Sequence, residues 1–74
     1  MTPHETYLKK IGANIRHARI SNNIKQETLA KKVALSKSEI SRIENGKREV
    51  KISTLKKIAM AIGVPASALL DEYD

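Results

Sequence analysis

Apolar residues recur at three- and four-residue intervals along nearly all of this 74-residue chain, and no segment alternates apolar and polar residues as a strand does. Stop signals divide the pattern at Asn22-Asn23, at Asn45-Gly46 and at Gly63. Asparagine and glycine suit such positions because they tolerate the left-handed conformation that ends many helices. The sequence therefore predicts a single all-α domain of five short helices.

The starts of the helices are marked by residues whose side chains can accept hydrogen bonds from free backbone N–H groups. Thr2 with Glu5, and Ser36 with Glu39, have the spacing of a capping box. Ser53 is the expected cap of the fourth helix. We predict helices over about residues 3–22, 26–33, 37–45, 54–62 and 66–72. The inward-facing apolar residues, which form the predicted core, are Leu8, Ile11, Ile15, Ala18, Leu29, Ala30, Val33, Ile40, Ile43, Leu55, Ile58, Ala59, Ile62, Leu69 and Leu70.

Positive charge is concentrated in the first 57 residues. This segment holds all 14 Lys and Arg residues and five of the eight acidic residues, for a net charge of +9, whereas residues 58–74 carry a net charge of −3. Such a distribution indicates a polyanionic partner for the first segment. The only aromatic residues are Tyr7 and Tyr73, and surfaces that bind single strands usually stack bases on aromatic rings. The composition therefore favours double-stranded nucleic acid.

The sequence lacks the residues that several other classes of protein need. The absence of cysteine excludes disulfide scaffolds, Cys-ligated zinc and thiol catalysis. His4 and His17 lie on different faces of the first predicted helix, so they cannot share a metal, and no Gly-rich phosphate loop or nucleophile elbow occurs. The apolar stretch over residues 58–66 is too short to span a membrane, and no secretory signal is visible. We therefore expect a cytoplasmic protein that is not an enzyme and that has no cofactor, metal, membrane or small-molecule partner.

Only Ala34, Leu35 and Ser36 separate the second and third predicted helices. So short a turn makes two helices cross steeply, which lets one lie on a DNA backbone while the other enters the major groove. On a helical wheel, the side of the third helix opposite its apolar residues carries groups that donate to base edges or phosphates. They are Lys37, Ser38, Ser41, Arg42 and Asn45. The alternative interpretation is a solvated polar face, which is common on amphipathic helices.

Two lysines favour the DNA-binding interpretation. Lys25 directly precedes the second helix and Lys37 is the first residue of the third, where the helix dipole disfavours a positive charge. A docked DNA phosphate would relieve both conflicts, so we expect Lys25 to lie at the DNA backbone. The same wheels place Arg19 and Glu44 at the edges of the apolar stripes on the first and third helices, which predicts a partly buried structural ion pair.

Several runs of residues resemble the Cro/repressor (XRE-type) helix-turn-helix family in order and spacing. The runs are Gln26 to Val33, Ser36 to Ile43, Glu44 to Lys47 and Leu55 to Val64. The resemblance covers about residues 10–70 and implies a five-helix, lambda-repressor-like DNA-binding domain over residues 1–74, with the helix-turn-helix at about residues 26–45. It also implies a transcription regulator that binds a pseudo-palindromic operator as a homodimer, with the third helix in the major groove.

The resemblance further implies roles for individual positions. The family's base-reading positions fall on Ser36, Lys37, Ser38, Ser41 and Arg42. Its backbone-binding positions fall on Gln26, Asn45, Lys47 and Arg48, its buried ion pair falls on Arg19 and Glu44, and its dimer contacts fall on Leu69 and Leu70. Two positions depart from the family, because Ala34 stands where many members have glycine and Lys25 where members tend to have Ser, Thr or Asn.

The sequence leaves the regulatory role open. A phage-type repressor and the controller protein of a restriction–modification system both fit the resemblance. Repression fits it as well as activation does, with RNA polymerase as a candidate partner. The alternative from another functional class is an antitoxin-like module whose main partner is a second protein.

Overall fold

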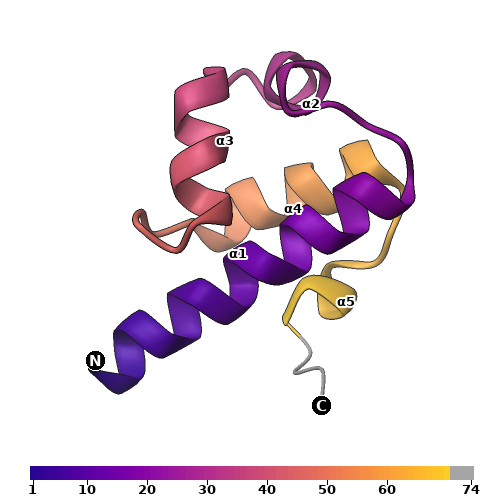
Figure 1. The fold of residues 1–74 in the computed structure, drawn as a ribbon. Helices are drawn as coiled ribbons and strands as arrows, with labels where there is room; N and C mark the ends of the chain where they lie inside the picture. The colour runs from indigo at the N-terminus through magenta and orange to yellow at the C-terminus, as the bar shows by residue number, and fades with distance from the viewer. Residues whose placement is uncertain (71–74) are drawn as a thin grey trace.

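All five predicted helices are present in the computed structural model, which describes residues 1–70 (Figure 1). They are α1 (Pro3–Ser21), α2 (Gln26–Lys32), α3 (Lys37–Glu44), α4 (Ile52–Ile62) and α5 (Ala66–Leu70). No strand occurs among the described residues, and the prediction of an all-α domain is confirmed. The expected extension of the last helix to Glu72 lies outside the described residues.

Both predicted capping boxes form. The Thr2 hydroxyl accepts a hydrogen bond from the Glu5 N–H (3.2 Å), and the Ser36 hydroxyl accepts one from the Glu39 N–H (3.1 Å). In return each glutamate accepts a hydrogen bond from the backbone N–H of its capping residue, at 3.3 Å in the first box and 3.0 Å in the second. The sequence therefore fixes the starts of α1 and α3 locally.

The predicted start of α4 is wrong. This helix begins at Ile52, with Lys51 rather than Ser53 as its N-cap. The Lys51 carbonyl already accepts a hydrogen bond from the Leu55 N–H (2.8 Å), so Ser53 lies within the first turn. Lys51 makes no capping hydrogen bond through its side chain, and the start of this helix therefore carries no side-chain signal in the sequence.

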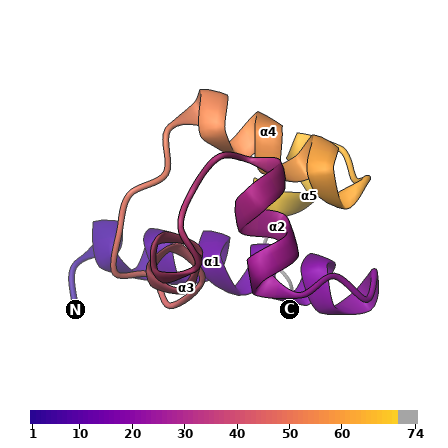
Figure 2. The same ribbon diagram turned by 90° about the horizontal axis from the view of Figure 1, so that it is seen from above.

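Each helix contributes one fully buried side chain to a single core. The five are Ile15, Leu29, Ile40, Ile58 and Leu69. Every other predicted core residue is buried or half-buried except Leu70, which is 45% exposed. α1 packs against α3, α4 and α5, and α2 packs against α3 and α4. Since α2 is seen end-on in Figure 1 and α3 end-on in Figure 2, the two helices cross steeply.

A glycine in α1 allows α3 to approach closely. A Cβ atom at Gly12 would lie 2.3 Å from the carbonyl oxygen of Ile43 and 2.6 Å from that of Glu44. Because these atoms belong to the backbone, a larger residue would push the C-terminal end of α3 away from α1. The position of α3 therefore depends on this contact.

The turn between α2 and α3 is left-handed at Ala34 (φ 57°). The next residue, Leu35, donates its backbone N–H to the Ala30 carbonyl (2.9 Å), which closes the turn after the last residues of α2. A left-handed alanine costs about 1–2 kcal/mol relative to glycine. In the described part of the chain, the other residues with positive φ are the three predicted stops Asn23, Gly46 and Gly63.

Candidate nucleic-acid interface

The polar side of α3 faces solvent, opposite the core. Ile40 and Ile43 are buried, whereas Lys37, Ser38 and Arg42 are exposed. Within residues 1–70 these three exposed side chains take part in no hydrogen bond or ion pair. Their donors are therefore available to an external ligand.

Two other predicted DNA-binding residues, at the two ends of α3, have partners within the protein. The Ser36 hydroxyl accepts the capping hydrogen bond from Glu39 and keeps its proton free to donate. The Asn45 side-chain nitrogen donates to the Ser41 carbonyl oxygen (2.8 Å) and lies 3.4 Å from the Ser41 hydroxyl. Both hydrogen bonds hold the Asn45 amide against the last turn of α3.

A buried ion pair joins the elements around α3. Arg19 Nε lies 2.7 Å from Glu44 Oε2, and Arg19 Nη2 lies 3.1 Å from Oε1. Arg19 Nη1 also donates to the Ile24 carbonyl (2.8 Å), while Gln26 Nε2 donates to Glu44 Oε1 (3.0 Å). Both charges are thus hydrogen-bonded as well as paired, which buried ions require. This network ties α1, the loop before α2, α2 and α3 together.

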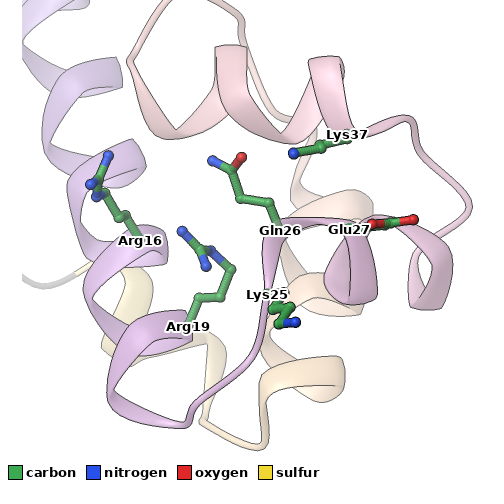
Figure 3. Close-up of a pocket in the computed structure, with 6 residues that line it drawn as sticks. All are labelled: Arg16, Arg19, Lys25, Gln26, Glu27 and Lys37. Atoms are coloured by element: carbon green, nitrogen blue, oxygen red, sulfur yellow. The ribbon is translucent and has the colours of Figure 1, made fainter.

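A shallow basic hollow opens beside this network. It has a volume of about 450 Å³ and is lined by Arg16, Arg19, Lys25, Gln26, Glu27 and Lys37. Figure 3 shows Gln26 between Arg16 on α1 and Lys37 on α3. The structure therefore brings Lys37, at the start of α3, together with the adjacent residues Lys25 and Gln26 at the start of α2, and adds Arg16 to them.

Sequence reasoning missed Arg16. The available signal was its spacing, because Arg16 precedes Arg19 by three positions and so lies on the same side of α1, one turn earlier. The conflict predicted at Lys25 is present, since this residue is the N-cap of α2 and its side chain makes no capping hydrogen bond.

Two predicted backbone-binding cations lie in the loop after α3. Lys47 is exposed and Arg48 is half-exposed. Arg48 Nη1 lies 3.2 Å from Glu39 Oε1, so this cation is paired within the protein. The backbone N–H of Ser36 and then the Arg48 guanidinium lower the pKa of Glu39. Sequence reasoning treated Glu39 only as a capping residue and missed its link to Arg48.

The two predicted dimer contacts, Leu69 and Leu70, differ in exposure. Leu69 is 0% exposed, because its side chain fills the core of its own chain, so it offers no surface to a second copy. Leu70 is exposed. An open apolar hollow of about 420 Å³ lies on α4 and the start of α5, and its lining residues are Lys56, Ala59, Met60, Val64 and Ala66. Met60 is 82% exposed.

Residues 1–70 contain no group of three His, Cys, Asp or Glu side chains of the kind that a metal site would need. None of the helices in this part of the chain is both long and apolar enough to cross a membrane.

Known proteins share both the sequence and the fold. The chain is 41% identical over 61 residues to the control protein C.BamHI of Bacillus amyloliquefaciens, over 81% of this chain and 75% of that protein. It is 36% identical over 61 residues to the ImmF control region 10 kDa protein of Bacillus phage phi105, over 82% of this chain and 68% of the relative.

Among solved structures, the restriction-modification controller protein C.AhdI from Aeromonas hydrophila superposes with a TM-score of 0.86 at 31% identity, over 92% of this chain and 99% of that one. The helix-turn-helix (HTH_3) family matches residues 15–69, from the middle of α1 to α5. This match covers well over half of the chain. The protein is therefore a member of the helix-turn-helix (HTH_3, XRE-type) family of DNA-binding transcriptional regulators.

Proposed function

We propose that the protein is a sequence-specific regulator that binds a pseudo-palindromic operator in duplex DNA as a homodimer, with α3 in the major groove. The observation that carries this proposal is the arrangement of α2 and α3. The two helices cross steeply around Ala34, and α3 exposes unpaired Lys37, Ser38 and Arg42 away from the core. The resemblance to two control proteins supports a regulatory role.

The side chains divide into two groups by their position around α3. Base edges are read by Ser36, Lys37, Ser38, Ser41 and Arg42, with Lys and Arg preferring guanine O6 and N7. Phosphates are bound by Lys25, Gln26, Asn45, Lys47 and Arg48, which set the register of the protein on the duplex. The buried pair of Arg19 and Glu44 has a structural role, because both of its side chains are satisfied within the protein.

The apolar hollow on α4 and α5 is the proposed interface with a second copy. Residues 58–74 carry no cation and a net charge of −3, so this end of the chain does not suit a DNA surface. Met60 exposes apolar surface in the hollow, and Leu70 exposes apolar surface at the end of α5. A single α3 reads too few base pairs for useful specificity, whereas two copies related by a two-fold axis place their α3 helices about 34 Å apart.

Selection of bound duplexes from a random pool tests the proposal. We expect enrichment of a pseudo-palindrome whose half-sites lie about one helical turn apart or a multiple of it, bound by two chains per duplex. A pool without enrichment would overturn it. Co-purification of a second small protein, together with no sequence preference in DNA, would favour the protein-interaction module instead.

A further inference from the structure

The basic hollow contains cations that the rest of the protein does not neutralise. Arg19 is not one of them, because Nε, Nη1 and Nη2 all donate to partners within the protein. Both oxygens of its partner Glu44 are likewise occupied. The carboxylate of Glu27 lies 3.7 Å from Lys31 Nζ on α2, and Figure 3 shows it directed away from Gln26. The hollow therefore has no free carboxylate.

Three cations in the hollow remain unpaired. Arg16 on α1, Lys25 before α2 and Lys37 on α3 have no ion pair with any residue in the described part of the chain. Arg16 and Lys37 approach the hollow from opposite sides, with the side chain of Gln26 between them (Figure 3). Unpaired like charges on three neighbouring elements repel one another, and an anion between them removes that repulsion.

The amide of Gln26 is already held in place at the centre of this hollow. Its nitrogen donates one hydrogen to Glu44 Oε1 (3.0 Å), which leaves the second hydrogen to donate elsewhere. Glu44 is itself fixed by two hydrogen bonds from Arg19. The donor is thus oriented before any ligand binds, and such preorganisation lowers the entropic cost of binding.

We propose that Arg16 binds the DNA backbone, and that Arg16, Gln26 and Lys37 together hold a single phosphodiester phosphate in the basic hollow. The inference rests on the proposed DNA binding and extends the interface to α1. The planar guanidinium of Arg16 supplies paired donors that match two phosphate oxygens, Lys37 supplies a point charge, and Gln26 supplies a neutral donor. The inference moves Lys37, which lines the hollow from the start of α3, from the bases to the backbone and leaves base reading to Ser36, Ser38, Ser41 and Arg42.

The test combines protein variants with duplexes in which single phosphates are replaced by neutral methylphosphonates. In wild-type protein, we expect one phosphate per half-site whose replacement weakens binding about tenfold, as loss of charge-assisted hydrogen bonds does. Arg16→Ala should weaken binding to the unmodified duplex by a similar factor. With that one phosphate replaced, Arg16→Ala should have almost no further effect. On the unmodified duplex, Arg16→Ala should also reduce the slope of log affinity against log salt concentration by about one unit per subunit.

Lys57→Ala is the matched control, because it removes one exposed cation from α4, outside the basic hollow. Equal affinity and salt dependence for Arg16→Ala and Lys57→Ala would overturn the inference. So would an undiminished effect of Arg16→Ala on every methylphosphonate duplex. Failure of the proposed function itself would look different, because the wild-type protein would then bind no duplex selectively. Arg16 is exposed, so thermal unfolding should show that Arg16→Ala folds as the wild type does.

Discussion

Ala34 occupies a backbone conformation that suits glycine better than alanine. Its φ of 57° is fixed by the short turn between α2 and α3, and the residue is exposed, so no packing offsets the strain. Ala34→Gly should raise the free energy of unfolding by about 1 kcal/mol, because relief of left-handed strain exceeds the added entropy of the unfolded chain. Urea denaturation measures the difference.

Ala13→Gly is the control for this substitution, since Ala13 is exposed in the interior of α1. There glycine should lower the free energy of unfolding by about 1 kcal/mol. Effects of the same sign at Ala13 and Ala34 would contradict the assignment of strain to the turn.

Glu39 connects the start of α3 to the following loop. The Ser36 N–H and the Arg48 guanidinium both lower its pKa, so its charged form stabilises the fold above the ordinary pKa of a glutamate in the unfolded chain. That contribution is lost as the pH falls through the lower pKa of the folded protein. Glu39→Gln keeps a side chain that can complete the capping box but removes the charge. Its destabilisation should therefore be present at pH 7 and vanish in acid, as denaturation at a series of pH values would show.

The same variant releases Arg48 from its partner. Because the pair is 3.2 Å long in the free protein, a DNA phosphate must compete with Glu39 for the guanidinium. Glu39→Gln should accordingly bind DNA more tightly at low salt than the wild type. Equal stability of the variant and the wild type across the whole pH range would refute this role of Glu39.

At the scale of elements, α3 and the loop after it should contribute differently to binding. Arg42 lies on the exposed side of α3, whereas Lys47 follows the end of that helix. Arg42→Ala should weaken binding to the selected operator by about 1–3 kcal/mol and broaden the sequence preference. Lys47→Ala should weaken binding to operator and random duplexes alike. It should also reduce the slope of log affinity against log salt concentration by about one unit per subunit. Titrations on both duplexes at several salt concentrations separate the two effects, and identical behaviour of the two variants would show that the roles are wrongly assigned.

Elements whose structure depends on local chemistry were predictable from the sequence. The capping boxes at Thr2 and Ser36 fix two helix starts, and helical wheels identify the buried faces, including the edges where Arg19 and Glu44 meet. The start of α4 was not predictable, because its N-cap, Lys51, makes no side-chain hydrogen bond.

Contacts between elements were harder to predict than the elements. Arg16 and Lys37 are 21 positions apart, and only the packing of α1 beside α3 brings them to one hollow. The pairing of Glu39 with Arg48 depends on the path of the loop after α3, which periodicity does not report. Leu69 and Leu70 are adjacent in sequence, and the orientation of α5 alone decides which of them is buried.

At the scale of the whole molecule, the basic hollow and the apolar hollow lie on different elements. The basic hollow is lined from α1, α2 and α3, whereas the apolar hollow lies on α4 and the start of α5, with Lys56 as its one cation. The proposed two-fold dimer through that hollow would leave the α3 face of each copy uncovered, so that both faces could meet the same side of a duplex. Dimerisation and operator binding should therefore be coupled.

Met60→Glu tests this coupling. Since the Met60 side chain is 82% exposed, its replacement should cost the folded monomer little, but it places a charge in the proposed dimer interface. Analytical ultracentrifugation should show a monomer for Met60→Glu and a dimer for the wild type, and affinity for a full operator should fall at least tenfold, whereas affinity for a single half-site should be unchanged. Ile52→Glu is the matched control, because Ile52 is also an exposed apolar residue of α4, 74% exposed, but does not line the apolar hollow. A dimer that survives Met60→Glu but not Ile52→Glu would move the interface to the start of α4.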